Sequence, residues 1–550
     1  MLDYYDLGSH SRKVSTSSQT AQSWFDRGLV WCYGYNHDES VACFERALEA
    51  DPDLAIAHWG AAYAQGCNYN KPWEAFDAEE MQTSLAAAYR HVGLALDKID
   101  QANPAEAALI QALARRYQSN SASSDEATTW NRDYADAMRE VYRRFPHDLD
   151  VATLFTEALM NLTPWQLWDL ETGQIAESAA TEEAIEVTEK AMLLDGAEVH
   201  PGLLHLIIHL WEMSPTPERA LKAGDALRDL APDAGHLRHM PTHIDVLCGH
   251  YERVVSSNHA AIVADTKYLD REGPLNFYSL YRCHDYHFKI YGAMFLGQFR
   301  PAMEAVEAMI ATLPEDLLSM QSPPMADWLE GFVSVKQHVL IRFGRWEEIV
   351  AQALPDNSDL FCVTTAMMHY AKAVAHAASG QVPQAETEAA RFEDAFARVP
   401  ESRYIFNNSC RDILTIAREM MLGELAYRKE EYEAAFAHLR RSVHLDDTLP
   451  YDEPWAWMQP TRHALGALLL EQQHYEEAAK VYREDLGLEP SLPRAVQNPD
   501  NVWSLHGYHE CLVHLGRTDE ARFIKQRLDL ANGRTDTPVK SSCFCKLGSH

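Results

Sequence analysis

Residues 21–54, AQSWFDRGLVWCYGYNHDESVACFERALEADPDL, decide the fold class. Four of these residues follow the spacing of a helix–turn–helix unit of about 34 residues. They are a small residue at Gly28, an aromatic one at Phe44, a small one at Ala47 and a proline at Pro52. The two helices of such a unit cannot bury their apolar faces alone. The stretch therefore predicts that further helix pairs stack against it.

The same pattern recurs along the chain. Specific copies begin at Gly423, in GELAYRKEEYEAAFAHLRRSVHLDD, and at Gly466, in GALLLEQQHYEEAAKVYREDLGLEP. Weaker copies show a glycine-x-aromatic turn at 249–251, 297–299 and 344–346. We interpret these turns as the links between the two helices of successive pairs.

These sequences resemble the tetratricopeptide repeat over roughly residues 21–535, with irregular insertions near 68–80 and 164–180. The resemblance implies an all-α solenoid, a superhelix of antiparallel helix pairs that share one core. No sustained alternation of apolar and polar residues predicts strands. Residues 1–20 are expected to form an N-terminal segment, and residues 536–550 a C-terminal tail with a C-x-C motif.

Composition excludes several classes of function. Acidic residues outnumber basic ones by 33, so we expect neither nucleic acid nor an anionic membrane as a partner. The sequence MLDYYDLGSHSRKVSTSSQ lacks the apolar region of a signal peptide, and no apolar run reaches membrane-spanning length. Most of the ten cysteines stand among apolar residues, which is typical of reduced thiols in the cytoplasm. Because the sequence contains no Walker or dinucleotide motif, no nucleotide cofactor is expected.

The middle of the chain carries histidines at helical spacing. The resemblance implies that positions 2, 5, 9, 12 and 13 of the first helix of each repeat line a concave groove, since they share one helix face. Numbered from the turn glycines and closing prolines, three consecutive first helices place seven histidines at such positions: His205, His209, His236, His239, His243, His284 and His287. The neighbouring groove positions hold Glu157, Asn161, Tyr291 and His338.

This set of histidines predicts a metal centre. Two histidines one helical turn apart can chelate one ion, and adjacent helices pack about 8–10 Å apart, close enough to share it. Since the outer two helices lie about twice as far apart, we expect two ions, with the middle helix serving both. The leading ligands are His205, His209, His239, His243, His284 and His287. Further candidate ligands are His236, Glu157, His338, Cys543 and Cys545.

The ligand type narrows the choice of metal and substrate. Neutral imidazoles suit transition metals, whereas magnesium and calcium prefer oxygen ligands. A pair of ions held by six histidines would be similar to a type-3 copper site, so copper is favoured, followed by iron or zinc. Aromatic residues nearby suit a small organic substrate. The residues expected to contact it are Tyr291, Asn161, Trp211, Arg462, Glu453 and Trp455.

Three features leave alternatives open. Pro241 would kink its helix or begin it, and a helix beginning there would place His236 and His239 on the entering loop. The C-x-C motif in an extended chain is not expected to close on itself as a disulfide, so it is either a disordered end or a metal-handling tail. Residues 451–466 either contact substrate or pack as a loop on the next repeat.

The sequence thus predicts a metal-dependent oxidoreductase on a helical-repeat scaffold, acting on a small organic substrate. The alternatives are a zinc-type hydrolase that uses the same site, a non-enzymatic adaptor that binds a peptide or protein partner, and a metal-storage protein. The adaptor ranks lower because the resemblance implies Lys, Arg and Asn at groove positions 2, 5 and 9. The central repeats carry histidine there instead.

Overall fold

The computed structural model describes residues 4–546, which form two compact units. The first unit takes in the chain up to Ile244 together with Ala260–Arg271, and the second takes in Asp245–His259 and the chain from Glu272 onward. Residues 1–3 of the predicted N-terminal segment and residues 547–550 of the predicted tail lie outside the described residues.

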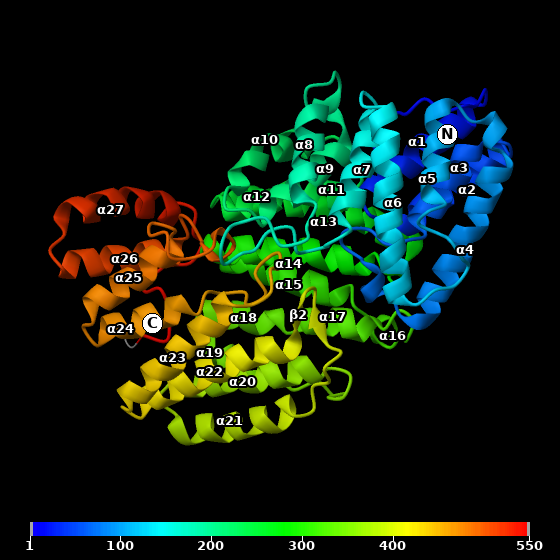
Figure 1. The fold of residues 1–550 in the computed structure, drawn as a ribbon. Coiled ribbons are helices and arrows are strands. Elements are labelled where there is room, and N and C mark those ends of the chain that lie inside the picture. Colours follow the sequence, from blue (N-terminus) through cyan, green and yellow to red (C-terminus); the bar gives the residue numbers. More distant parts are fainter. Residues whose placement is uncertain (1–3, 547–550) are drawn as a thin grey trace. The chain divides into compact units, whose positions relative to one another are not determined.

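The first unit is built almost entirely of helices, drawn from blue to green in Figure 1. They are α1 Gln19–Tyr33, α2 His37–Ala50, α3 Ala55–Ala64, η1 Trp73–Ala75, α4 Ala78–Asp97, η2 Ile99–Gln101, α5 Pro104–Leu113, α6 Ser124–Arg144, α7 Leu149–Met160, α8 Thr181–Ala191, η3 Ala197–Val199, α9 Pro201–Glu212, η4 Pro217–Ala220, α10 Leu221–Leu227 and α11 Gly235–His239. The residues of α12 Pro241–Leu247 and α13 Tyr251–Glu272 divide between the two units.

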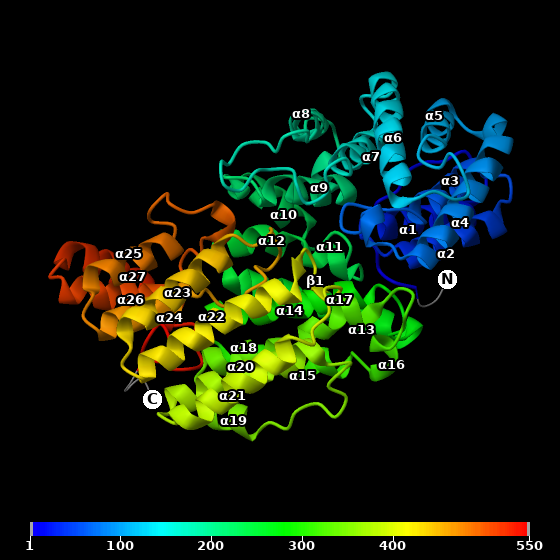
Figure 2. The ribbon, with the colours of Figure 1, turned by 60° about the horizontal axis from the view of Figure 1, so that its bottom comes forward.

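The second unit is also built of helix pairs. Its helices are α14 Ser279–Phe295, α15 Phe299–Ala311, α16 Glu315–Leu318, α17 Met325–Val333, α18 Val335–Arg342, α19 Trp346–Ala351, α20 Cys362–Ala378, α21 Val382–Phe396, α22 Cys410–Arg428, α23 Tyr432–Asp447, α24 Arg462–Glu471, α25 Tyr475–Asp485, η5 Arg494–Val496, α26 Val502–His514 and α27 Thr518–Asn532. Helices α20 to α23 lie side by side in both ribbon views (Figures 1 and 2) and pack pairwise in chain order.

Side-chain hydrogen bonds explain where the two helices of the first pair begin. Helix α1 begins after Ser18, whose hydroxyl accepts a hydrogen bond from the Ala21 amide (3.2 Å). Helix α2 begins after Asn36, whose side chain accepts from the Glu39 amide. The third helix then packs on the second, as a stacked repeat requires. The predicted all-α helical-repeat fold is confirmed.

Phe44 shows how closely these helices approach. Its ring lies against glycines from both flanking helices, because a Cβ added at Gly28 would stand 2.8 Å from the ring and one at Gly60 only 2.5 Å. The small residue and the aromatic residue of the sequence pattern, Gly28 and Phe44, are therefore in contact with each other. Gly60 of α3 supplies a second small residue that the pattern had not singled out.

Two local features differ from expectation. A two-residue hairpin, β1 Tyr404–Ile405 with β2 Asn408–Ser409, precedes α22, although no strand was predicted. Its register pairs Tyr404 with Ser409 and Ile405 with Asn408.

Pro241 begins α12, so the histidines predicted on one helix lie on two: His236 and His239 on α11, and His243 on α12. None of the described helices has the length and apolarity needed to cross a bilayer.

Replacing Gly60 with alanine is expected to lower the free energy of unfolding by about 1–3 kcal/mol, because the new Cβ overlaps the Phe44 ring. The matched control is Gly93→Ala on the exposed face of α4, where a Cβ would meet no described atom within 4 Å. That change is expected to raise the free energy of unfolding by about 0.5–1 kcal/mol. Urea titration of both variants measures the difference, and equal stability of the two would contradict the packing described for Phe44.

Candidate metal centre

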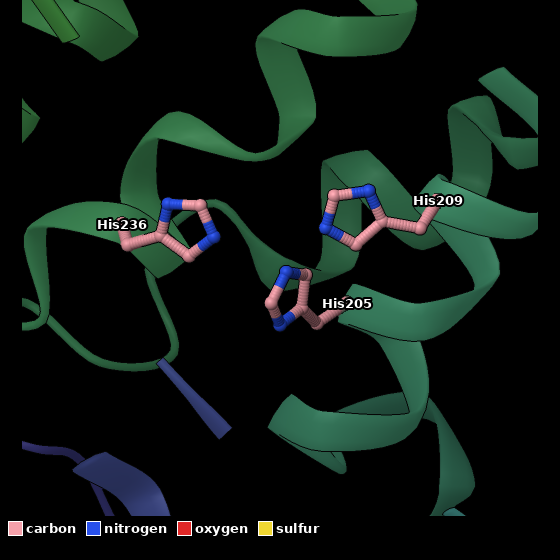
Figure 3. A group of neighbouring side chains, drawn as sticks. All are labelled: His205, His209 and His236. Atoms are coloured by element: carbon pink, nitrogen blue, oxygen red, sulfur yellow. The ribbon is translucent and has the colours of Figure 1, made fainter. Parts of the chain in front are cut away.

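Helix α9 brings two of the predicted ligands together. His200 caps it, accepting a hydrogen bond from the Leu203 amide at Nδ1 (3.1 Å), and Pro201 occupies its first turn. All twelve residues of the helix are buried. His205 and His209 lie one turn apart, so their imidazoles stand on the same face. Figure 3 shows them turned toward His236 of α11.

These three histidines form a converging set of nitrogen donors. One ligand nitrogen from each of His205, His209 and His236 lies within 4.8 Å of the others. The ring centroid of His205 is 4.8 Å from that of His209 and 5.0 Å from that of His236. The structure thus joins the predicted pair on α9 to His236, which the sequence had ranked only as a further candidate.

Hydrogen bonds fix which nitrogen carries the proton in two of the rings. His205 donates from Nδ1 to the backbone carbonyl of Tyr33 (2.6 Å), and His209 donates from Nδ1 to Glu212 Oε1 (2.8 Å). In a neutral imidazole the other nitrogen then holds a lone pair. Within residues 4–546, Nε2 of His205 and Nε2 of His209 have no hydrogen-bond partner. Both lone pairs are therefore available as ligands.

Glu212 is a candidate site residue that the sequence pattern did not single out. Its side chain is fully buried, and its second oxygen accepts a hydrogen bond from Nδ1 of His243 (2.7 Å). One carboxylate thus orients His209 and His243, the role that outer carboxylates commonly have around metal-bound histidine. The signal was present in the sequence, since Glu212 follows His209 by three residues and shares its helix face.

His239 and His243 form a second pair beside this carboxylate. Their Nε2 atoms are 2.7 Å apart, a hydrogen-bond distance. Because Nδ1 of His243 donates to Glu212, Nε2 of a neutral His243 accepts the proton of His239. The predicted ligand pair is therefore present as a hydrogen-bonded pair that extends the network from Glu212.

Burial controls the protonation of the three converging imidazoles. It lowers the pKa of His205 to about 3. The pKa values of His209 and His236 lie well below the ordinary value, because burial is reinforced by the charges that neighbouring imidazoles would carry. The rings are neutral at pH 7, which is the form that binds a metal ion.

Aromatic side chains enclose the same place. The Tyr35 ring lies 4.7 Å from His205, 5.5 Å from His236 and 6.2 Å from His209. Tyr35 has a φ of 55°, in the left-handed region that a bulky residue rarely adopts. Strained backbone of this kind gathers at functional sites. Tyr69 and Trp165 also pack on His209, at 4.9 and 5.9 Å.

Glu157, predicted as a further ligand, lies next to these aromatic side chains. Tyr63 donates a hydrogen bond to its Oε2, and Tyr35 also bonds to it. Burial raises the pKa of Glu157, and these hydrogen bonds together with the charge of Arg116 oppose that shift. Glu157 is thus linked to the three histidines through the Tyr35 ring that touches them.

The remaining histidines of the predicted set lie in the second unit. His284 packs edge-on against Phe406 (4.7 Å), His287 against Phe332 (5.1 Å) and His338 against Trp457 (4.7 Å). Burial lowers the pKa of His287 and of His338 to about 3. The two-ion centre that joins His284 and His287 to the first unit stays a prediction.

The residues predicted to contact a substrate have local partners. Asn161 ends α7, and Trp211 packs on Trp168 (5.7 Å). Tyr291 donates to Asn498 (3.3 Å). The remaining three lie in or beside the 451–460 loop: Arg462 pairs with Asp447, Trp455 donates to Asp446 Oδ1 (3.0 Å), and Glu453 is buried. For the three residues in or beside the 451–460 loop, these contacts describe a loop packed on its neighbouring helices.

The C-terminal motif differs from expectation in two ways. Cys543 and Cys545 form a disulfide, so the expectation that the motif cannot close on itself is wrong. The disulfide leaves neither sulfur as a thiolate, the form that binds metal. Residues 541, 542, 544 and 545 are buried, so this end is not the disordered tail of the alternative interpretation.

A third polar cluster surrounds Asp150. Its carboxylate accepts hydrogen bonds from Arg12 (2.9 Å), Tyr33 (2.7 Å) and His200 (3.2 Å), and His10 lies 3.3 Å away. Although burial by itself would raise the pKa of Asp150, these hydrogen bonds and the charge of Arg12 hold it well below the ordinary value. Both oxygens of the carboxylate accept hydrogen bonds. We therefore assign this cluster a structural role, which is to hold the N-terminal segment in place.

Comparisons with known proteins bear on the fold. Residues 36–54, which span α2 and the turn after it, match the family model described as tetratricopeptide repeat. The resemblance on which the fold prediction was based is thereby confirmed where the match falls. Outside it, the repeated helix pairs of both units follow the same arrangement. No curated protein matches the sequence.

Solved structures of helical proteins resemble the chain at low identity. Yeast Tom70 is 12% identical, with 93% of each chain covered and a TM-score of 0.30. The APC/C hetero-tetramer Cut9-Hcn1 is 11% identical, with 95% of each chain covered and a TM-score of 0.27. Ypp1 is 8% identical, covering 96% of this chain and 82% of the other, with a TM-score of 0.42. Scores this low give no basis for transferring a function.

Asp150→Asn is expected to lower the free energy of unfolding at pH 7 by about 1–3 kcal/mol, because Arg12 loses one of its two carboxylate partners and keeps only Asp148. Since the folded pKa of Asp150 lies below its unfolded value, the carboxylate stabilises the fold above about pH 4, and this contribution is lost as the pH falls toward the folded pKa. Unfolding of both proteins from pH 7 to pH 3 measures this. An unchanged pH dependence in the variant would contradict the assignment.

Proposed function

We propose that this protein is a metal-dependent enzyme built on a tetratricopeptide-type scaffold. One observation carries the proposal. Hydrogen bonds to Tyr33 O and Glu212 hold the protons of His205 and His209 on Nδ1, so that two Nε2 lone pairs converge with His236 in a fully buried place. Such fixed tautomers are a regular feature of histidine metal sites.

Without a bound ligand, burying these histidine side chains would cost free energy. A buried polar atom left without a hydrogen bond costs about 1–3 kcal/mol, and two such nitrogens lie side by side here. Ordinary core histidines avoid this penalty, as His200 does by using both ring nitrogens. A metal ion would use the lone pairs of His205 and His209 together.

The donor set favours copper, followed by iron or zinc. Three neutral nitrogen ligands suit each of these ions, and copper(II) binds most tightly in the divalent series. Three histidines leave a coordination position for water or substrate, which is typical of catalytic sites. A bound ion would supply Lewis acidity and, for copper or iron, electron transfer. Oxidation of a small organic molecule is our first candidate reaction, with hydrolysis at a zinc ion as the second.

The protein's own groups would orient and protect this chemistry. Tyr35, Tyr69 and Trp165 provide apolar faces that would hold an organic substrate and limit access of water. Glu212 would keep His209 in its ligand orientation throughout. The buried carboxyl of Glu157, whose pKa is raised by burial, lies within the same aromatic network as a candidate proton acceptor.

A non-enzymatic adaptor is the second candidate function. The match of residues 36–54 to the tetratricopeptide repeat favours it, since such repeats are mostly interaction scaffolds. An adaptor needs no metal. If the protein reconstituted separately with copper, iron(II) or zinc retains no stoichiometric ion after gel filtration, the adaptor replaces the enzyme as the conclusion.

His205→Ala and His236→Ala are each expected to abolish stoichiometric metal binding, because each removes one of three converging ligands. Elemental analysis after reconstitution measures the metal content. His91→Ala is the matched control, since His91 is also buried in the first unit and its ring nitrogens contact His58 and Arg90. Equal loss of metal in all three variants would sink the assignment of the ligands.

Glu212→Gln is expected to weaken metal affinity by about 10- to 100-fold, because the amide cannot accept from two imidazole N–H groups at once. Competition with a chromophoric chelator measures the affinity. Replacement of the exposed Glu218 by glutamine removes the same charge nearby and is expected to leave the affinity unchanged. A weakening that is equal in the two variants would mean that overall charge, and not orientation of His209, sets the affinity.

A further inference from the structure

A fully buried arginine lies among the helices of the first unit. Arg116 follows α5 and is 1% exposed. Its Nη2 donates to the backbone carbonyl of Cys67 (2.5 Å) and lies 2.8 Å from Cys67 Sγ. Within residues 4–546, its Nε and Nη1 have no hydrogen-bond partner. Because a guanidinium stays protonated in proteins, Arg116 is a buried positive charge with unused N–H donors.

Aromatic rings surround this guanidinium. Its central carbon lies 5.3 Å from the ring centroids of Tyr63 and Tyr134, and 5.9 Å from that of Tyr117. Tyr63 belongs to α3 and Tyr134 to α6, and both helices pack on α5. The faces of these rings attract the positive charge, but they do not replace a hydrogen-bond acceptor for its N–H groups.

The same surroundings hold further unused donors. The hydroxyls of Tyr117 and Tyr134 and Nε1 of Trp73 are buried, and in the described part of the chain none of the three has a hydrogen-bond partner. Burial raises the pKa of both tyrosines above the ordinary value, so both hydroxyls keep their protons. A Cβ added at Gly66 would stand 1.9 Å from the Tyr117 hydroxyl, so only glycine lets this hydroxyl approach the backbone beside Cys67.

Two acidic groups near Arg116 do not supply the missing acceptor. Glu157 accepts a hydrogen bond from Tyr63 and another from Tyr35, and its carboxylate forms no ion pair with Arg116 among the described residues. Burial raises the pKa of the Cys67 thiol even though the charge of Arg116 opposes this shift, so the thiol is neutral at pH 7. A buried charge without a contacting counter-ion is strongly unfavourable, and so are buried donors without an acceptor.

We propose that Arg116, Tyr117 and Tyr134 form a binding site for a small monovalent anion, with a halide such as chloride as the ligand class. One negative charge neutralises the single guanidinium, and a spherical ion accepts hydrogen bonds from N–H and O–H groups that approach from different directions. A dianion would leave an excess negative charge buried near Glu157, which disfavours it. The inference does not rest on the metal centre, since none of these three residues is a proposed metal ligand.

The test is thermal unfolding of the full-length protein at pH 7, with chloride replacing gluconate at constant ionic strength. An ion that binds only the folded state stabilises it, so the unfolding midpoint is expected to rise to a plateau about 3 °C higher as chloride saturates the site. Arg116→Met removes the charge and is expected to abolish this rise. An unchanged midpoint in the wild type, or an equal rise in the Arg116 variant, overturns the proposal.

Tyr134→Phe deletes a single hydroxyl and covers the case in which the Arg116 variant fails to fold. It is expected to raise the half-saturating chloride concentration about tenfold, because the ion loses one O–H donor. Tyr33→Phe is the matched control, since its buried hydroxyl donates to Asp150, and the half-saturating concentration is expected to stay unchanged. His205→Ala removes a proposed metal ligand and is likewise expected to keep the chloride response, which separates the two proposals. Equal half-saturating concentrations in the Tyr134 variant and the wild type overturn the anion site.

Discussion

The complete burial of α9 is the constraint on which the candidate site depends. Helix pairs of this fold cannot bury their apolar faces alone, and α9 is covered by its neighbours α1, α7, α8 and α10. All twelve residues of α9 are buried, including two imidazoles and one carboxylate. Desolvation keeps those imidazoles neutral, and the requirement that buried donors be satisfied places their protons on Nδ1. The lone pairs on Nε2 follow from these two requirements.

Two buried polar clusters of the first unit behave in opposite ways. Around Asp150, both oxygens of the carboxylate accept hydrogen bonds, and these bonds tie the N-terminal segment to α7 and α9. Around Glu212, the same chemistry satisfies the Nδ1 atoms and leaves Nε2 of His205 and of His209 without a hydrogen-bond partner among the described residues. A buried carboxylate whose two oxygens both accept hydrogen bonds stabilises the fold, whereas buried nitrogen lone pairs without a partner can bind a ligand. This contrast supports a binding role for the Glu212 cluster and a structural one for Asp150.

The second unit uses buried charge for a different purpose. Arg342 and Arg428 lie on inner helices, where an unpaired guanidinium would be unfavourable, and each binds a carbonyl of the C-terminal segment. The same helix-pair architecture therefore carries buried imidazoles on α9 of the first unit and buried guanidinium groups on α18 and α22 of the second. What differs is the side chain placed on the inner helix face, not the backbone that carries it.

The sequence by itself determined the helix pairs, because Gly28, Phe44 and Pro52 report contacts and turns within one local unit. It also determined that His205 and His209 share a face, since helical spacing fixes that. Only the tertiary structure decided that His236 joins them, that Glu212 orients His209 and His243, and that Cys543 bonds to Cys545. Those outcomes depend on where Pro241 begins α12, on which carboxylate is buried beside which ring, and on the path of an irregular segment. Helical periodicity places Glu212 on the same helix face as His209, but it carries no information about the other outcomes. Each of those is set by contacts between residues distant in the chain or by backbone that follows no regular repeat.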